Sequence, residues 1–197
     1  MMRAVLREAD HMNAQNVANT LWAFAKVDYQ LGEVHEPMMR AVLRESDSMN
    51  TQGVSNTLWA FAKLDCQLGE VHEPMMRAVS READHMNAQE VANTLSAYVK
   101  LGLSLGEAQR LVLCTVRRQA GSMTSQQVTN TLLGFAKLSL QLGDAHEPVM
   151  QAVVRESGNM TALEVVNTLW AFNVLGVQLE EAPGPLMRAL ARTVPTF

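Results

Sequence analysis

The sequence has few of the residues and segments that many classes of protein need. Only two cysteines, Cys66 and Cys114, occur in 197 residues, which excludes a disulfide scaffold and fits a reducing compartment. No uninterrupted apolar run approaches the ~18 residues that a membrane span requires. Acidic residues outnumber basic ones, and the formal net charge is −4. We therefore expect an intracellular soluble protein without membrane contact, and the bulk charge excludes a simple polybasic binder of phosphate groups.

Catalytic and metal-binding signatures are also missing. His35, His72 and His146 each precede Glu-Pro, but no His-Glu-x-x-His spacing follows, and successive copies are a whole repeat apart. No glycine-rich phosphate loop and no Gly-x-Ser-x-Gly motif occur. Both cysteines and most of the 13 methionines read as core residues. We expect no enzyme, and hence no catalytic residue, metal site, cofactor or small-molecule substrate.

What the sequence does contain is an internal repeat. The tripeptide Asn-Thr-Leu recurs at intervals of 37 residues that never slip, beginning at Asn19, Asn56, Asn93, Asn130 and Asn167. Residues 19–42 and 56–79 differ at only two positions. A fixed period of this length is typical of repeat architectures, and the near-identity indicates recent duplication.

Each unit is predicted to form two helices. In the first unit, apolar residues at helical spacing predict a helix over residues 14–28, with Asn13 as its N-cap and a left-handed turn at Gly32. A second helix is expected over residues 37–47, with Pro37 in its first turn. We expect this second helix to bury Met39, Val42 and Ser46, and we expect no strands because no period-2 alternation persists.

Stacked helical pairs of this kind form an α-solenoid, so the expected fold is all-α, a single solenoid over residues 1–197 with about five repeats and eleven helices. The approximate units are 1–12 (second helix only), 13–49, 50–86, 87–123, 124–160 and 161–197. Neither end shows the polar capping unit that solenoids normally carry, so we expect the chain to be a fragment of, or to derive from, a longer array.

Charged residues keep fixed places in the repeat. All four lysines occupy one position, Lys26, Lys63, Lys100 and Lys137, and Val174 stands there in the fifth unit. A second position always carries arginine: Arg7, Arg44, Arg81, Arg118, Arg155 and Arg192. We favour a structural role for these arginines, either pairing with the following glutamate or covering apolar surface with the side-chain stem.

Three-four spacing predicts that Asn16, Asn19 or Thr20, Ala23 and Lys26 share a polar stripe on the first helix. One stripe position varies between units, namely Asn16, Gly53, Glu90, Gln127 and Glu164, while Asn19 and its equivalents Asn56, Asn93, Asn130 and Asn167 are constant. Amide and carboxylate groups suit base edges, and lysine suits phosphate. We predict that these residues and the four lysines bind RNA. A structural ladder of asparagine amides and a merely solvated row of lysines remain the alternatives.

The segment Met-Asn-Ala-Gln-Asn-Val-Ala-Asn-Thr-Leu-Trp-Ala-Phe-Ala-Lys, residues 12–26, resembles the first helix of octotricopeptide repeats. It is similar also to heptatricopeptide repeats and to the leucine-rich region of FAST-kinase-like proteins. The resemblance implies an RNA-binding α-solenoid of mitochondria or chloroplasts that acts in RNA stability, processing, splicing or translation, although no transit peptide is visible in this chain. The third unit departs from the pattern with Ser96 in place of tryptophan, and the fourth with Leu133. No RAP-type domain follows Phe197, so cleavage activity is not implied.

From the repeats and the resemblance we expect modular binding of single-stranded RNA without catalysis, at about one nucleotide per unit. The alternative is a protein–protein interaction scaffold of the armadillo or HEAT type, in which other proteins are the partners.

Overall fold

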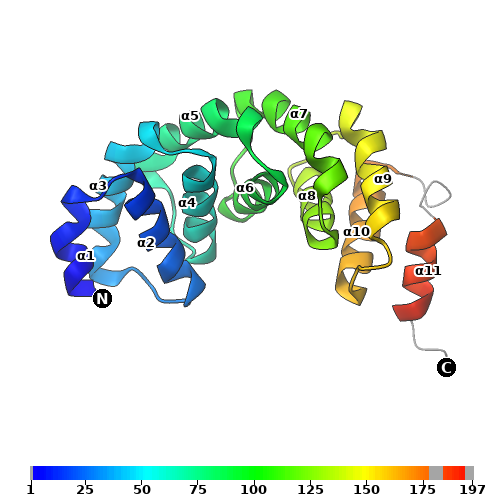
Figure 1. Cartoon of the computed structure of the whole chain (residues 1–197), viewed down its shortest axis with the longest axis horizontal. Coiled ribbons are helices and arrows are strands. Elements are labelled where there is room, and N and C mark those ends of the chain that lie inside the picture. Colours follow the sequence, from blue (N-terminus) through cyan, green and yellow to red (C-terminus); the bar gives the residue numbers. More distant parts are fainter. Residues whose placement is uncertain (1, 178–183, 194–197) are drawn as a thin grey trace.

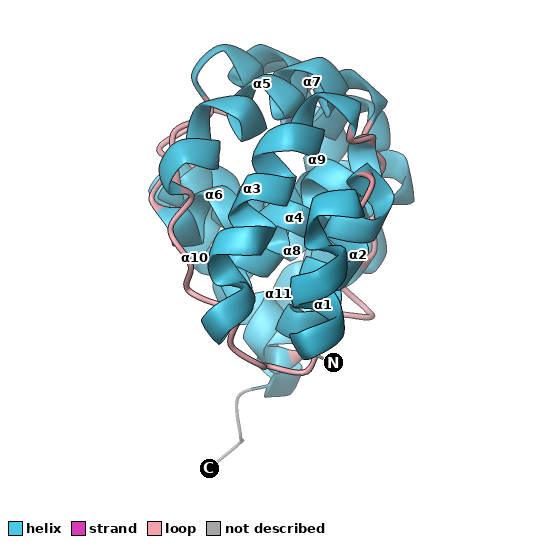
Figure 2. Ribbon diagram, turned by 90° about the vertical axis from the view of Figure 1, so that its left-hand side faces the viewer, coloured by secondary structure: helices cyan, strands magenta, loops and turns pink. Residues whose placement is uncertain are grey.

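The computed structural model describes residues 2–177 and 184–193, and these residues fold into helices joined by short turns, without strands (Figure 2). The first helix of each unit, which we call an inner helix, is α2 (Ala14–Lys26), α4 (Thr51–Lys63), α6 (Ala88–Leu101), α8 (Ser125–Lys137) or α10 (Ala162–Leu175). The second, which we call an outer helix, is α1 (Met2–Glu8), α3 (His35–Glu45), α5 (His72–Glu82), α7 (Gln109–Gln119), α9 (His146–Glu156) or α11 (Gly184–Thr193).

Short 3-10 helices flank the outer helices. One set precedes them: η2 (Gly32–Val34), η4 (Gly69–Val71), η6 (Gly106–Ala108) and η8 (Gly143–Ala145). The other set follows them: η1 (Ala9–His11), η3 (Ser46–Ser48), η5 (Ala83–His85) and η7 (Ala120–Ser122). The last expected unit, 161–197, contains residues 178–183 and 194–197, which lie outside the described residues, as does residue 1 of the first.

The helices form an arch. Figure 1 shows the inner helices side by side along its inner side and the outer helices along its outer curve, with α1 and α11 at opposite ends of the arch. Each inner helix contacts the next one, from α2 to α10, and also the outer helix of its own unit. The eleven α-helices of the described ranges confirm the all-α solenoid. Within those ranges, no helix is long and apolar enough to cross a membrane.

The start of the first helix was predicted correctly, but its end was not. Asn13 is the N-cap of α2, and its side chain accepts a hydrogen bond from the backbone N–H of Asn16 at 2.9 Å. The helix stops at Lys26 because Asp28 adopts a left-handed conformation with φ +53°. Gly32 also has positive φ, +50°, but it begins η2 rather than ending the helix. The outer helix α3 correspondingly begins at His35, before Pro37.

The buried stripe of the outer helix is rotated from the predicted one. Val42 and Ser46 are buried as expected, whereas Met39 is only half-buried and Met38 is fully buried. Val34, which is buried in the preceding turn, sets this phase because Met38 and Val42 follow it at intervals of four. The largest buried side chains belong to the inner helices and share one repeat position: Phe24, Phe61, Tyr98, Phe135 and Phe172. Burial raises the pKa of Tyr98, whose hydroxyl donates to the sulfur of Met76 at 3.0 Å.

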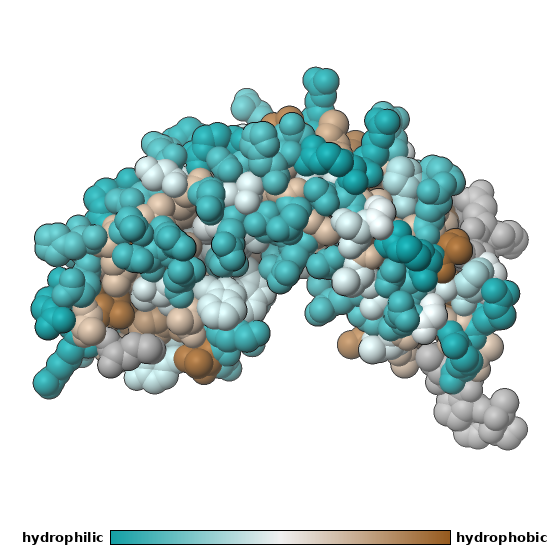
Figure 3. All heavy atoms as spheres, in the orientation of Figure 1, coloured by the Kyte–Doolittle hydropathy of each residue, from teal (hydrophilic) through white to brown (hydrophobic). Residues whose placement is uncertain are grey.

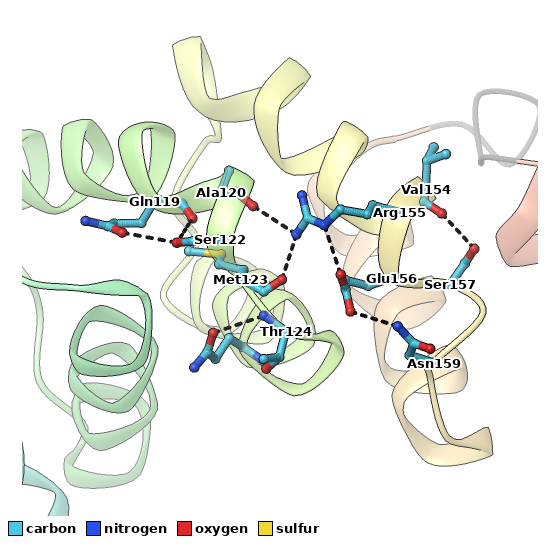
Figure 4. Close-up of polar contacts among 11 residues, drawn as sticks. Gln119, Ala120, Ser122, Met123, Thr124, Val154, Arg155, Glu156, Ser157 and Asn159 are labelled. Atoms are coloured by element: carbon cyan, nitrogen blue, oxygen red, sulfur yellow. Dashed lines mark hydrogen bonds and ion pairs between the residues drawn. The ribbon is translucent and has the colours of Figure 1, made fainter.

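The recurrent arginine joins consecutive units. Nη2 of Arg155 donates to the carbonyl oxygens of Ala120, at 3.2 Å, and of Met123, at 2.6 Å, while Nε donates to Glu156 at 2.9 Å (Figure 4). The hydrogen bonds from Arg155 and Asn159 hold the pKa of Glu156 below its ordinary value. These carbonyl groups lie in and just after η7, where the preceding outer helix has ended and its carbonyls lack helical partners.

The same arrangement repeats along the array. Arg44 donates to the carbonyls of Ala9 and Met12, and Arg81 to those of Ser46 and Met49. Arg118 is a variant, since it donates to the carboxylate of Asp84 at 2.8 Å and to the Asp84 carbonyl. The predicted pairing with the following glutamate is confirmed for Arg7, Arg44, Arg81 and Arg155, whereas Arg118 is followed by Gln119 and pairs with Asp84 of the preceding unit; the bonds from Arg44, Arg81 and Arg155 to carbonyl groups were not predicted. We call Arg44, Arg81, Arg118 and Arg155 the arginine clamps.

Inner helices approach one another through small side chains. A Cβ atom added at Gly134 of α8 would lie 2.8 Å from Cβ of Leu95 in α6, so this contact leaves no room for a methyl group. Ser55 lies in the α4–α6 part of the stack, where Ala18 and Ala92 are its equivalents. Its hydroxyl is fully buried and has no hydrogen-bond partner in the described structure. Thr129, at the same repeat position, instead pairs with Thr168 at 3.2 Å.

Replacing Arg81 with methionine should destabilise the array. The carbonyls of Ser46 and Met49 would lose their charged donor, and loss of such a partner costs about 1–3 kcal/mol. Urea unfolding followed by circular dichroism measures the change. Arg77→Met is the matched control because Arg77 lies one turn earlier on α5, is exposed and forms no hydrogen bond or ion pair in the described structure. Equal midpoints for the two variants would show that the clamp contributes no stability.

Replacing Ser55 with alanine should raise stability by about 1 kcal/mol, because a buried hydroxyl without a partner is removed. Ser46→Ala is the control, since Ser46 is equally buried but its hydroxyl donates to the Leu43 carbonyl at 3.3 Å. The same unfolding measurement should give opposite signs for the two variants. A loss of stability for Ser55→Ala would mean that the hydroxyl is satisfied in solution.

Candidate functional site

Each inner helix has one side that no other element covers. In α4, α6 and α8 the outer helix packs on one side and the neighbouring inner helices on two others, so the remaining side faces the inner curve of the arch (Figure 1). The equivalent positions of α2 and α10 follow from the repeat. The side chains on it follow a 4-3-4 spacing, which keeps them on one helical face. We call these positions the inner row: Gln15, Asn19, Trp22, Lys26; Gln52, Asn56, Trp59, Lys63; Gln89, Asn93, Ser96, Lys100; Gln126, Asn130, Leu133, Lys137; and Leu163, Asn167, Trp170, Val174.

All members of the inner row are exposed or half-buried. Its lysine and asparagine positions are those that the sequence predicted, but the rest of the predicted stripe was wrong. The repeat positions of Thr20 and Ala23 face the neighbouring inner helix instead. Their equivalents in the second unit, Thr57 and Ala60, are completely buried. The Thr57 hydroxyl donates to the sulfur of Met49 at 3.7 Å, which fixes this side of the helix against the preceding loop.

The variable position lies at the helix N-terminus, next to the inner row rather than on it. Glu90 Oε2 accepts from the backbone N–H of its own N-cap, Asn87, at 2.9 Å, and Oε1 accepts from the hydroxyl of Thr51 in the preceding inner helix at 3.1 Å. Gln127 and Glu164 close the same reciprocal capping arrangement in α8 and α10. Asn16 is exposed and Gly53 is buried. Three of the five predicted base readers therefore already use a side-chain oxygen within the fold.

The asparagines of the inner row have free amides. Asn56, Asn93, Asn130 and Asn167 are half-buried and Asn19 is exposed, yet none of the five side chains forms a hydrogen bond within the part of the chain that the structure describes. The alternative of a structural amide ladder is therefore not seen among these residues. Their donors and acceptors remain available to a ligand on the inner side of the arch.

Two of the four lysines, Lys100 and Lys137, have ammonium groups without a partner among the described residues. Lys63 lies 3.7 Å from the carboxylate of Asp28, but both side chains are exposed, and such pairs contribute about 0–1 kcal/mol. Lys26 lies over the Trp22 ring at 5.7 Å from its centroid. In the described ranges, Lys100 and Lys137 form no ion pair. Within residues 2–177 and 184–193, these two lysines therefore have neither a counter-ion nor a ring partner.

Three tryptophans belong to the inner row, and the sequence interpretation missed them as site residues. Trp22 and Trp170 are 40% and 44% exposed, and Trp59 is half-buried. Tryptophan is apolar enough to be assigned to a helix contact, but its place three residues after the asparagine and four before the lysine puts it on their face. That spacing was the signal that could have identified it.

Other candidate groups do not assemble. Among the described residues, no three His, Cys, Asp or Glu side chains come together in a way that could hold a metal ion. Cys66 is half-buried, and burial, followed by the nearby Asp65 charge, raises the pKa of its thiol. Cys114 is exposed, contrary to expectation, because it occupies the outward position that Arg40 and Arg77 hold in other units.

A hollow of about 450 Å³ lies at the N-terminal end, between α1 and α2. Its walls include Asn16, Thr20 and Ala23, which are more exposed than their buried equivalents Gly53, Thr57 and Ala60. In α4 these positions pack against the preceding inner helix. The hollow thus has the lining of a contact between units, with Asn19 of the inner row at its edge. The outer curve of the arch is mostly hydrophilic (Figure 3).

Comparison with known proteins gives one family match. A family described as a protein of unknown function, DUF1601, is similar to this chain over residues 1–21, 71–95 and 107–132. Each matched segment runs from an outer helix into the following inner helix, which shows that the match follows the repeat. No curated protein matches the chain.

Replacing Glu90 with alanine should destabilise α6 and its contact with α4, because two hydrogen bonds to the carboxylate are lost, each contributing about 0.5–1.5 kcal/mol. Thermal unfolding followed by circular dichroism measures the effect. Gln89→Ala is the control, since Gln89 is exposed and its side chain forms no hydrogen bond in the described structure. Equal stability of Glu90→Ala and Gln89→Ala would contradict a structural role for the variable position.

Proposed function

We propose that the inner row binds single-stranded RNA along the concave side of the arch. Its charge supports this most directly: the row contains four lysines and no carboxylate, in a chain whose net charge is −4. Most acidic residues instead lie in the turns and on the outer helices, as Glu33, Glu70, Glu107 and Asp144 do, and Glu90 and Glu164 lie in the first turns of α6 and α10. On the inner side of the arch, a polyanion would meet the lysines of α2, α4, α6 and α8.

The other residue types in the row suit the remaining parts of a nucleotide. Exposed indoles stack on bases without regard to sequence, which supplies about 1–3 kcal/mol per base in single-strand binders. Asparagine and glutamine amides form paired hydrogen bonds with base edges. Each unit therefore offers an asparagine amide, four units add a lysine for a phosphate contact, and three add a stacking surface. Five units would engage about five nucleotides.

The biological setting that we propose follows the resemblance to octotricopeptide-type proteins, namely RNA stability, processing or translation in a mitochondrion or chloroplast. No catalytic step is proposed, since the chemistry of the row is that of recognition. Amides and indoles would also suit an extended peptide, as in a scaffold of the armadillo or HEAT type. The recurrence of lysine in four of five units, without acidic residues, favours the polyanion.

The triple variant Lys63→Gln, Lys100→Gln, Lys137→Gln should bind single-stranded RNA more weakly and with less salt dependence. Each lysine that contacts a phosphate contributes about 0.7 to the slope of log K against log salt for single strands, so the slope should fall by about 2. Fluorescence anisotropy with labelled ten-nucleotide RNAs of mixed sequence, from 50 to 300 mM salt, measures both quantities.

The matched control is Arg3→Gln, Arg40→Gln, Arg77→Gln, which removes the same charge from exposed residues of the outer helices. Its slope should equal that of the wild type. If both triple variants lose the same affinity, the attraction is non-local and the inner row is not the binding site. If the wild type binds no RNA at the lowest salt, the proposed function is wrong and a peptide ligand becomes the better candidate.

A further inference from the structure

Two units of the array depart from the others at adjoining places on the inner side. In α6 the tryptophan of the inner row is replaced by Ser96, and in α8 by Leu133. Directly after Leu133, α8 carries Gly134, whereas Ala23, Ala60, Ala97 and Ala171 stand at this position in the other units. A hollow of about 320 Å³ lies beside these residues, between α6 and α8.

The walls of this hollow are apolar and its ends are polar. Val99 from α6 and Leu133 from α8 are half-buried and line opposite sides, and Gly134 contributes backbone only. Because a Cβ at Gly134 would meet Leu95, the two helices are in direct contact beneath the hollow, which closes it on the side of the core. It is therefore a pocket open toward the inner curve of the arch.

Lysines and an amide lie around this pocket. Lys100 belongs to α6 and Lys137 to α8, so each helix supplies one exposed ammonium group. Neither forms an ion pair, and the Asn130 amide, which also lines the pocket, forms no hydrogen bond within the described residues. Lys137 and Val99 also line an adjoining hollow of about 470 Å³ toward the turn at residues 102–109, so the pocket does not end in a closed wall there.

The apolar walls, the free amide and the two ammonium groups of the pocket are together complementary to the chemical groups of one nucleotide. A heterocyclic base is planar and apolar on its faces, its edge carries hydrogen-bonding groups, and its phosphates are anionic. A volume of about 320 Å³ lies at the lower end of the 300–1,000 Å³ typical of ligand pockets, which suits a single ring system rather than an extended ligand.

We propose that the pocket between α6 and α8 encloses one nucleobase, with the flanking phosphates on Lys100 and Lys137 and the base edge at Asn130. This inference rests on the proposed function and deepens it. Where the row carries tryptophan, a base lies on an open indole surface. Between α6 and α8, where both tryptophans are absent, one base inserts between the helices and sets the register of the RNA on the array.

The decisive variant is Ser96→Trp, which restores the residue found in units one, two and five and fills the pocket. A set of ten-nucleotide RNAs, each with one abasic site at a different position, reports on each base separately. Fluorescence anisotropy measures the affinity of the protein for each RNA. In the wild type, one abasic position should weaken binding about tenfold, because stacking and edge contacts of a single base are lost. In Ser96→Trp, binding of the intact RNA should weaken about tenfold and this position dependence should disappear.

If the inner row were only a series of stacking surfaces, Ser96→Trp would add a stacking surface and RNA would bind more tightly. Tighter RNA binding by Ser96→Trp would therefore contradict the pocket proposal. Equal affinities of the wild type for all positions of the abasic site would also contradict the pocket proposal. Ser48→Trp is the matched control because Ser48 is exposed in η3, away from the inner row, and should bind as the wild type does.

A second measurement separates failure of the pocket from failure of RNA binding. Each of the four nucleoside 5′-monophosphates is titrated into the ¹⁵N-labelled protein, and the backbone amides of Ser96 and Gly134 are followed by NMR. Saturable shifts at these amides that vanish in Ser96→Trp support a nucleotide site, even if no RNA is retained. If none of the four shifts them, and the RNA scan shows no single sensitive position, the pocket does not bind a base.

Discussion

The stack of inner helices is the constraint on which the rest of the structure depends. Each inner helix carries apolar residues on more than one side, so it is buried only when a neighbour lies on each flank and an outer helix lies behind it. Small residues allow the close approach, and it is closest where Gly134 meets Leu95. The arginine clamps act at the same junctions, because they supply donors to carbonyls that the ends of the outer helices leave without partners.

This constraint leaves every inner helix one free side and makes that side the same in every unit. Since packing takes the other sides, buried positions vary only among residues of similar size, such as Ala18, Ser55 and Thr129, and larger changes lie at the inner row, at exposed outer positions or in turns. Ser96, Leu133 and Val174 illustrate the first case and Cys114 the second. Variation at the helix N-terminus is restricted more strongly, because Glu90, Gln127 and Glu164 also have to satisfy an N-cap.

The fold could be predicted from the sequence because a 37-residue period without slippage specifies stacked units, and Asn13 and its equivalents mark where each first helix begins. The face that binds a ligand was harder to predict. Positions 16, 19, 23 and 26 fit three-four spacing as well as positions 15, 19, 22 and 26 do, and choosing between them requires knowing which side the neighbouring helices cover. Hydrophobicity favoured the wrong choice, since Trp22 is apolar but exposed whereas Thr57 is polar but buried.

Net charge is a poor guide to this protein for a related reason. At physiological ionic strength, charges separated by more than about 8 Å are largely screened in solvent, so a ligand on the inner side responds mainly to the groups beside it. Those groups include lysines in four of five units, and one of them, Lys63, has a turn carboxylate, that of Asp28, 3.7 Å away. An acidic chain can therefore present a positive row, provided that the stack keeps equivalent positions in register. The pocket between α6 and α8 depends on the same register, because its two ammonium groups come from different units.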